Sequence, residues 1–389
     1  MSSVRIASYN ILSDALATPK MYPHAAAADL KPAVRMERIL SRLQAEVDKG
    51  AVINLQEVSL SFGASLHAFF AERDYCMINI NNGSPFNGYM GPAIAFSRSM
   101  FDLVSVDQKR ISDTKCTRWP KHDMSQESYI KAAYRFAWNK LLPPFLKSWL
   151  PAWLAPRDFW DEWDQAEARQ NPICGVLLRR KFEQSAAVTT EDAAADAAVS
   201  SPAKAASPFW VFSVHMPCLF RTERDVKALA IHCALVGQHV HRTAAGAPFV
   251  LAGDFNIKPS DDTYALLNRG ALPAESRARP CVRPPPAAAN KDKPAEPDRF
   301  ECTVPAGGMR SAYVEALGRE PDFTNHALSD FSDDGKPFTE TLDYIFLSPH
   351  WSVKSVRELP ARATATKAAC SPNGDEPSDH LLIAADLVL

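Results

Sequence analysis

The chain has 389 residues, of which 46% are hydrophobic and 23% are charged, and its formal net charge is −2. This composition excludes a disordered protein and a uniformly basic nucleic-acid coat, and the length suffices for one large α/β domain or two ordinary ones. The eight cysteines are scattered and form no C-x-x-C pair, so they indicate neither a zinc site nor a disulfide framework. A reducing compartment suits this pattern.

No targeting segment is predicted. The first strand-like run, residues 4–12, begins almost at the initiator methionine and leaves no room for a signal or transit peptide. No stretch reaches the roughly 18 uninterrupted apolar residues that a membrane-spanning helix requires. We therefore expect a cytoplasmic protein.

Strand-like and helix-like segments alternate along the whole chain. Short runs rich in Val, Ile and aromatic residues predict strands at 4–12, 51–58, 92–97, 173–182, 209–216, 248–256, 341–348 and 381–389. Apolar stripes with helical spacing occupy 36–47 and 226–240, and a further helix is expected between an N-cap at Ser260 and a C-terminal glycine, Gly270. This alternation predicts a single α/β domain over residues 1–389.

Three segments interrupt the alternation. Residues 186–208 are rich in Ala, Ser and Thr, and residues 273–299 are rich in Pro and Ala, so both are expected to be flexible loops. Residues 109–165 instead contain six of the eight tryptophans, and positions 109–147 carry nine basic against three acidic residues. We interpret 109–165 as a Trp-rich, basic helical insertion. It either packs on the domain surface or offers a cationic aromatic surface to RNA, a membrane or a protein.

Carboxylates, amides and histidines gather at the strand ends. Strand ends at one edge of an α/β sheet converge, so residues far apart in the sequence can line one pocket. Each residue alone is weak evidence for a site, because Glu57 could be a surface charge at a strand end and His215 could be an ordinary core histidine. Asp254 and Asn256, two positions apart on a strand, are expected to point the same way, so that one accepts from and the other donates to a single ligand.

Together these residues resemble the endonuclease/exonuclease/phosphatase superfamily of Mg²⁺-dependent phosphoesterases. The blocks follow the superfamily's order: Tyr9-Asn10, Leu55-Gln56-Glu57-Val58, Gly91-Pro92-Ala93-Ile94-Ala95, His215, Gly253-Asp254-Phe255-Asn256, Ser311-Ala312-Tyr313, Asp343-Tyr344-Ile345 and Ser378-Asp379-His380. The resemblance implies a four-layer αββα sandwich, in which helices flank two mixed β-sheets.

The branch is indicated by Phe323-Thr324-Asn325 followed by Leu342-Asp343-Tyr344-Ile345-Phe346, which looks most like the deadenylase and nocturnin branch. The chain departs from that branch in the 16 residues between Asn325 and Leu342 and in the insertion at 109–165. These departures put the substrate in doubt.

The resemblance also implies roles for individual residues. Glu57 would be the principal Mg²⁺ ligand, assisted by Asn10 and Asp379, and Mn²⁺ could substitute. Asp254 and Asn256 would orient the attacking water, and His215 would donate a hydrogen bond to the phosphate. His380 would contact the phosphate while Asp343 fixes its tautomer. Asn10, Asn325 and Tyr313 would bind substrate. The resemblance does not decide which group is the general base.

Three functions follow from this interpretation. The first is a 3′–5′ exoribonuclease of the deadenylase type that releases 5′-nucleotides from an RNA 3′ end. The second is a nucleotide phosphatase or 2′,5′-phosphodiesterase, because the near-neutral charge suits a small substrate equally well. The third is a sphingomyelinase-like lipid phosphodiesterase that docks through 109–165. The sequence indicates no oligomeric state.

Overall fold

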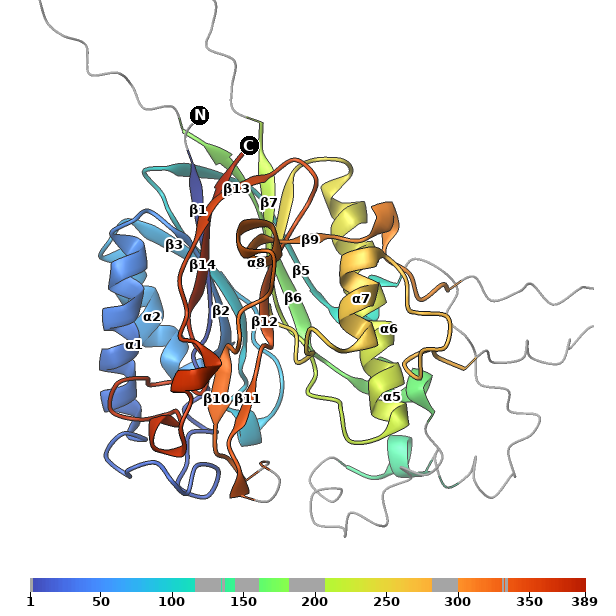
Figure 1. Ribbon diagram of the computed structural model, residues 1–389, viewed down its shortest axis with the longest axis horizontal. Helices are drawn as coiled ribbons and strands as arrows, with labels where there is room; N and C mark the ends of the chain where they lie inside the picture. The colour runs from blue at the N-terminus through green and yellow to red at the C-terminus, as the bar shows by residue number, and fades with distance from the viewer. Residues whose placement is uncertain are drawn as a thin grey trace, which may run out of the picture.

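Two six-stranded β-sheets pack face to face, and helices cover their outer faces (Figure 1). The structure is a computed structural model that describes residues 3–115, 134, 137–143, 161–181, 207–281, 300–330, 332 and 335–389. The predicted αββα sandwich with two mixed sheets is confirmed. Each sheet combines parallel and antiparallel pairs, since β1 runs parallel to β2 and antiparallel to β14, while β7 runs parallel to β8 and antiparallel to β6.

The strand order places the N-terminal and C-terminal strands side by side. The first sheet runs in the order β13 (Ser352–Val356), β14 (Ile383–Val388), β1 (Val4–Asn10), β2 (Val52–Val58), β4 (Gly91–Ser97) and β3 (Tyr75–Asn79). The second runs in the order β5 (Phe101–Arg110), β6 (Pro172–Arg180), β7 (Phe209–His215), β8 (Phe249–Asp254), β12 (Asp343–Leu347) and β9 (Arg310–Ser311). A separate two-stranded ribbon pairs β10 (Asn325–Ala327) with β11 (Phe338–Glu340).

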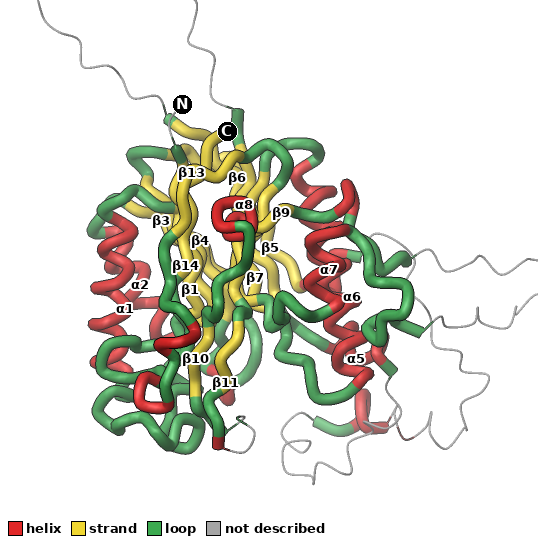
Figure 2. Tube along the Cα trace, viewed as in Figure 1, coloured by secondary structure: helices red, strands yellow, loops and turns green. Residues whose placement is uncertain are grey.

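The helices divide between the two outer faces, as the red segments of Figure 2 show. The first sheet is covered by α1 (Pro32–Val47) and α2 (Leu60–Ala71), and the second by α5 (Glu162–Ala168), α6 (Glu223–Ala244) and α7 (Asp262–Arg269). A short helix, α8 (Ala312–Leu317), follows β9. The predicted apolar stripes explain this placement, because Met36, Ile39 and Leu43 of α1 are buried against the first sheet.

Three layers of core result. One apolar cluster fills the space between the sheets, a second lies under α1 and α2, and a third lies under α5, α6 and α7. The inner strands are buried on both faces and therefore read as continuous hydrophobic runs in the sequence.

Several local predictions need correction. The helix expected after Ser260 has Asp261 as its N-cap, although Gly270 ends it in the left-handed conformation as predicted. Residues 273–281 of the expected flexible loop pack on the domain, because Ala278 is buried in the core and Arg279 donates to the carbonyl of Leu272. Residues 282–299 and 182–206 lie outside the described residues.

Only parts of the Trp-rich insertion, 109–165, belong to the part of the chain that the structure describes. It begins within β5 and ends at α5. Trp163 is a core residue whose indole donates to the carbonyl of Cys281, so this tryptophan packs as the simpler interpretation expects. Trp119, Trp149, Trp153 and Trp160 lie outside the described residues.

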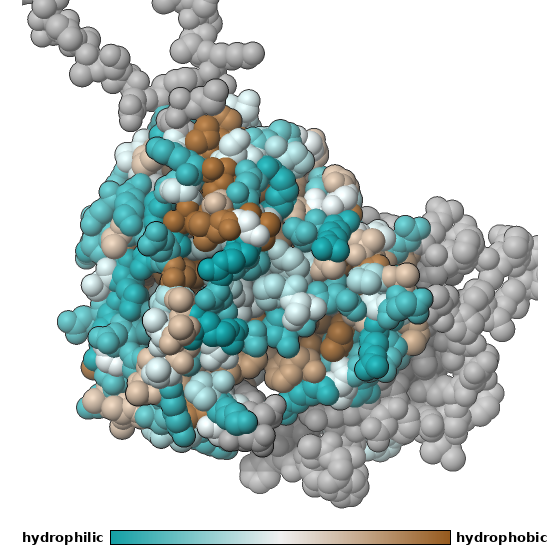
Figure 3. Space-filling model, viewed as in Figure 1, coloured by the Kyte–Doolittle hydropathy of each residue, from teal (hydrophilic) through white to brown (hydrophobic). Residues whose placement is uncertain are grey.

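The visible surface is mostly hydrophilic. In Figure 3, apolar groups gather in the upper middle of the view, over the region of β13 and α8. Among the described residues, no helix combines the length and apolar character needed to cross a bilayer.

Gly253 lies where the backbones of β7 and β8 approach each other closely. Its φ is +149°, and a Cβ atom there would lie 2.0 Å from the carbonyl oxygen of Val214. We expect Gly253→Ala to lower the free energy of unfolding by more than about 4 kcal/mol, because backbone must move. Gly246→Ala is the control: its φ is +87° but nothing lies within 4 Å, so only left-handed strain of about 1–2 kcal/mol is expected. Equal midpoints in urea unfolding would contradict this prediction.

Candidate active site

The first sheet contributes Asn10 and Glu57, which end the parallel strands β1 and β2. Parallel strands finish at the same edge, so the two side chains meet there. Glu57 lies where the pairing of β2 with β4 shifts register, and its φ is +59°. This bulge turns the carboxylate toward Asn10, and β2 ends one residue later, at Val58.

The second sheet contributes His215, Asp254 and Asp343 at the matching edge. His215 and Asp254 end the parallel strands β7 and β8, and Asp343 begins β12, which pairs antiparallel with β8 so that Asp343 lies opposite Asp254. All three residues are buried.

The amide of Asn10 joins the two halves. Its Nδ2 donates to Glu57 Oε1 and to Asp254 Oδ2, each at 3.0 Å. Its Oδ1 accepts from the backbone N–H of Leu12 at 3.0 Å, which fixes the orientation of the amide. His215 Nε2 lies 3.6 Å from Asp254 Oδ2 and 3.9 Å from Glu57 Oε1. The structure thus places the nitrogen of Asn10, rather than its oxygen, toward the carboxylates.

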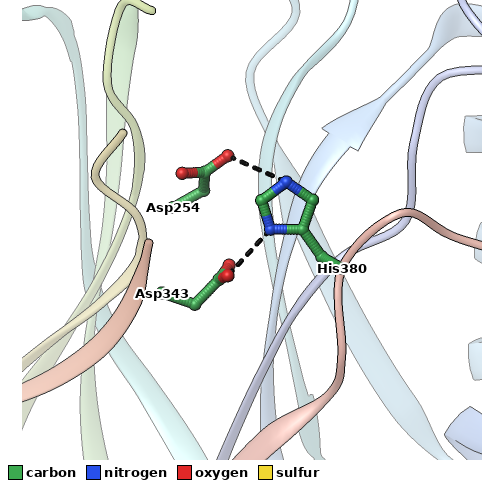
Figure 4. Close-up of side chains that lie close together, drawn as sticks. All are labelled: Asp254, Asp343 and His380. Carbon is green, nitrogen blue, oxygen red and sulfur yellow. Dashed lines mark hydrogen bonds and ion pairs between the residues drawn. The ribbon is translucent and has the colours of Figure 1, made fainter. Parts of the chain in front are cut away.

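His380 lies between two carboxylates (Figure 4). Its Nδ1 donates to Asp343 Oδ2 at 2.7 Å, and its Nε2 lies 3.6 Å from Asp254 Oδ2. Burial disfavours the charged imidazole, but the nearby carboxylates of Asp343, Asp254 and Asp379 outweigh it and hold the pKa of His380 well above its usual value. The predicted pairing of Asp343 with His380 is present. Thr324 completes it, because its hydroxyl donates to the same Oδ2 at 2.6 Å.

Asp379 and Asn325 adjoin this group. The Asp379 Oδ2 accepts from the Tyr22 hydroxyl at 2.8 Å and from Asn325 Nδ2 at 3.5 Å. Asn325 belongs to β10, and its backbone forms an antiparallel bridge with His380. Tyr22 therefore positions the carboxylate of Asp379, which the resemblance had predicted to assist in metal binding.

Two predicted residues are placed differently. Because β8 ends at Asp254 and Asn256 has a φ of +52°, strand alternation does not align the two side chains, and the Asn256 amide donates to the carbonyl of Met216 at 2.9 Å. Tyr313 does not join the site. It is buried in the core between the sheets on α8, and its hydroxyl donates to the carbonyl of Arg357. Its residue type matched the superfamily block, but burial leaves no surface for substrate.

Arg35 is a site residue that the sequence analysis missed. It is fully buried at the start of α1 and donates to the carbonyls of Ile11, Leu12 and Pro377 at 2.6–2.7 Å. These carbonyls belong to the segments that follow Asn10 and precede Asp379, so Arg35 ties both to one helix. A lone arginine in a helical stripe gives no sequence signal of this role.

The donor set suits a hard divalent cation. Glu57 and Asp254 are buried carboxylates that share one amide, and buried like charges need a cation or strong donors. Asp254, Asp343 and His380 could also hold a metal, since one ligand atom of each lies within 4.8 Å of the others. The Nδ1 of His380 is, however, already taken up by its hydrogen bond with Asp343 Oδ2. On the other side of Asp254, Glu57 and Asp254 would hold the cation, which would neutralise charge on a phosphate oxygen.

The arrangement defines a class of enzyme. Phosphoester hydrolysis needs neutralisation of the phosphate, a base for water and donors for the charge that develops, and this edge supplies groups for each. Residues 7–380 match the model of the Endonuclease/Exonuclease/phosphatase family. The chain belongs to this family, whose members are hydrolytic phosphoesterases, as the sequence analysis predicted.

Three known proteins share local sequence similarity with this chain. The chain is 34% identical over 140 residues to carbon catabolite repressor protein 4 homolog 4 of Arabidopsis thaliana, and 25% identical over 157 residues to nocturnin of Drosophila melanogaster. These matches cover 35% and 39% of this chain but only 26% and 21% of the relatives, so the chain aligns with about a quarter of their length. It is also 25% identical over 165 residues to 2′,5′-phosphodiesterase 12 of Mus musculus, covering 42% of this chain and 23% of that protein.

Solved structures agree on the fold. Over 99% of this chain and 95% of the other, the structure of ANGEL2, a 2′,3′-cyclic phosphatase, superposes with a TM-score of 0.63 at 19% identity. The catalytic domain of human nocturnin gives a TM-score of 0.54 at 18% identity, over 100% of this chain and 93% of that domain. The predicted deadenylase-like branch agrees with the sequence relatives, which include nocturnin and carbon catabolite repressor protein 4 homolog 4.

Arg35→Lys tests the role of Arg35. A lysine keeps the charge but cannot present three fixed donors, so we expect the free energy of unfolding to fall by roughly 2–4 kcal/mol. We also expect turnover to fall at least about tenfold, because the loops that carry Asn10 and Asp379 loosen. Arg38→Lys on the same helix is the control. Arg38 is partly exposed and pairs with Asp29, so its loss should cost about 1 kcal/mol or less. Indistinguishable variants would refute this role.

Glu376 gives a pH-dependent prediction. It accepts from the Tyr9 hydroxyl at 2.6 Å and lies 3.0 Å from Arg42, and burial raises the pKa of its carboxyl to about 7. The folded state thus favours the protonated acid, whose stabilisation is full below the unfolded pKa of 4.5 and is lost as the pH rises through about 7. Glu376→Gln does not titrate.

The stability of Glu376→Gln relative to the wild type should therefore increase by on the order of 3 kcal/mol between about pH 5 and pH 8. Urea unfolding at several pH values measures this difference. Glu301→Gln, at an exposed carboxyl, should show no such trend. Parallel pH curves for wild type and Glu376→Gln would rule the prediction out.

Proposed function

We propose that the protein is a Mg²⁺-dependent phosphodiesterase acting on nucleotides, and specifically a 3′–5′ exoribonuclease of the deadenylase type that releases 5′-nucleotides. The observation that carries this proposal is the joined set of Glu57, Asn10, Asp254 and His380, which offers a cation position on one side of Asp254 and an imidazolium on the other. The names of the relatives, nocturnin and carbon catabolite repressor protein 4 homolog 4, support the branch.

Exposed aromatic residues on segments that also carry site residues support a nucleotide substrate. Phe338 is 41% exposed at the start of β11, in the ribbon that also carries Asn325. Phe220 is 57% exposed, five residues beyond His215. Flat aromatic faces beside a phosphate site are suited to stacking on nucleobases.

The residues divide the chemistry among them. Asp254 is the group placed to take the proton of the attacking water, because it faces both histidines and the cation position. His215 and His380 are placed to donate hydrogen bonds to the phosphate as its charge increases, and each such donor contributes about 2.7–4 kcal/mol in comparable sites. Asp343 and Thr324 fix the ring of His380.

A second candidate is a nucleotide phosphodiesterase or phosphatase with a small substrate. It is favoured by the similarity to 2′,5′-phosphodiesterase 12 and to ANGEL2, a 2′,3′-cyclic phosphatase. The same residues would serve either reaction, since the two differ in the groups attached to the phosphate.

A substrate panel tests the proposal. Wild type and Glu57→Gln are given, with Mg²⁺, 5′-labelled oligo(A), RNA of mixed sequence, 2′,5′-oligoadenylate, adenosine 2′,3′-cyclic phosphate, NADP and sphingomyelin. We expect stepwise shortening of oligo(A) by the wild type, and a loss of at least about 10³-fold in the variant, because Gln cannot supply the charge that a cation needs. Circular dichroism and the melting temperature confirm that the variant is folded.

The outcomes separate the candidates. Intact RNA together with turnover of 2′,5′-oligoadenylate, the cyclic phosphate or NADP would replace the exoribonuclease by the small-nucleotide reaction. Turnover of sphingomyelin alone would move the protein to lipid hydrolysis. Wild-type rates in Glu57→Gln would refute the assigned site.

A further inference from the structure

A second aromatic surface is attached to the site through Glu57, whereas Phe338 lies in the ribbon that is attached through His380. The 3₁₀ turn Pro85–Asn87, labelled η1, and its neighbours carry Phe86 and Tyr89, which are 73% and 43% exposed. Leu60, at the start of α2, is 64% exposed, and its N–H donates to the carbonyl of Gly88 in the same turn. The turn and the first residue of α2 therefore present three large apolar side chains to solvent. We call Phe86, Tyr89 and Leu60 the η1 surface.

The η1 surface is attached directly to the catalytic carboxylate. Ser13 makes the link: its backbone N–H donates to Glu57 Oε2 at 2.9 Å, and its hydroxyl donates to the carbonyl of Asn87 at 2.9 Å. The contact is close, because a Cβ on Gly88 would lie 3.1 Å from the Ser13 hydroxyl and 3.1 Å from Ser59. One residue thus separates the metal-side carboxylate from the turn.

The turn is held in one conformation. Ser84 and Asn87 form a reciprocal cap across it, and Asn81 donates to the carbonyls of Val58 and Tyr89. Both Gly88 and Tyr89 adopt left-handed backbone conformations. A rigid turn that exposes an aromatic ring loses little conformational entropy when a planar ligand stacks on it.

The two aromatic positions attach to opposite ends of one series of contacts. The series runs from the turn through Ser13 to Glu57, through Asn10 to Asp254, and then to His380. His380 in turn bridges to Asn325 in the ribbon that carries Phe338. In this series of contacts, the residues around the phosphate position, Glu57, Asp254 and His380, join the η1 surface at the Glu57 end and the β10–β11 ribbon at the His380 end.

We propose that the η1 surface binds a second nucleobase, that of the nucleoside which leaves when the phosphodiester is cleaved. The substrate class is then a phosphodiester with a base on each side of the scissile phosphate, rather than a phosphate monoester or a cyclic phosphate. Phe338 serves the terminal nucleoside and Phe86 with Tyr89 serve the penultimate one. This inference rests on the proposed nucleotide phosphodiesterase function and adds the leaving-group side of its substrate.

The experiment removes the base and the ring in turn. The substrates are oligo(A), the same oligonucleotide with an abasic penultimate residue, and the same oligonucleotide with an abasic terminal residue. The enzymes are wild type, Phe86→Ala, Phe86→Trp and Phe86→Ala/Tyr89→Ala. We expect the alanine variants to lower kcat/KM for oligo(A) about 10- to 100-fold, the range expected for lost base stacking. They should leave kcat/KM for the abasic substrate within about twofold of wild type, and Phe86→Trp should retain activity on oligo(A).

Binding supplies a readout without turnover. Glu57→Gln is titrated with an oligonucleotide that carries 2-aminopurine at the penultimate position, and quenching of its fluorescence should disappear when Phe86→Ala is added. Leu317→Ala is the matched control, because Leu317 is 53% exposed on α8, remote from this turn, and should change neither rate nor quenching. Melting temperatures of all variants should agree, since Phe86 is exposed.

Each outcome has one meaning. Equal losses by the alanine variants on base-bearing and abasic substrates, or no loss on either, would overturn the η1 surface as a base site. Loss that disappears only when the terminal base is absent would overturn the assignment to the penultimate nucleoside. Failure of the wild type to cleave any phosphodiester of the panel would instead refute the proposed function itself.

Discussion

Three buried carboxylates, Glu57, Asp254 and Asp343, converge at the edge where the two sheets meet. Two unit charges at roughly 5–6 Å repel by about 3 kcal/mol at an effective dielectric constant of 20, so such a cluster exists only when donors and cations surround it. The donors are specific: the Asn10 amide between Glu57 and Asp254, and the His380 ring between Asp254 and Asp343. A substrate phosphate would bring more negative charge, and in the proposed mechanism a divalent cation beside Glu57 would offset it.

Two costly features of the surrounding fold, a strained backbone and a buried charge, accompany this arrangement. Glu57 occupies a left-handed conformation at a bulge, and Arg35 is buried with its guanidinium on three carbonyls of the site segments. Neither feature favours stability by itself, because strain and a buried charge both cost free energy. The bulge orients the Glu57 carboxylate, and Arg35 fixes the segments next to Asn10 and Asp379 at the edge where the strands end.

The alternation of apolar runs and helical stripes predicted an α/β domain, whereas the resemblance to the superfamily predicted the two sheets and the site residues. Buried strands appear as apolar runs, and polar residues directly after them mark the shared edge. The prediction for Asn256 was wrong in its geometry because alternation holds only within a strand, and β8 ends at Asp254. Tyr313 was misplaced because a motif records residue type, not burial. Three residues around the site were missed. Arg35 binds backbone carbonyls, Tyr22 binds the Asp379 carboxylate, and Ser13 links Glu57 to the turn at 85–87. Contacts of these kinds leave no periodic signal in the sequence.

The pairing of β1 with β14 has a consequence for synthesis. Val4 lies opposite Leu387, and Ser8 lies opposite Ile383. One side of β1 therefore stays unpaired until β14 has been synthesised. Asn10 ends β1 and His380 lies just before β14, so the site is built from the first and the last strands of this domain. Contacts of such long sequence separation form slowly. A nascent chain on the ribosome can form helices and hairpins, but it carries no assembled catalytic edge until translation of this domain is complete.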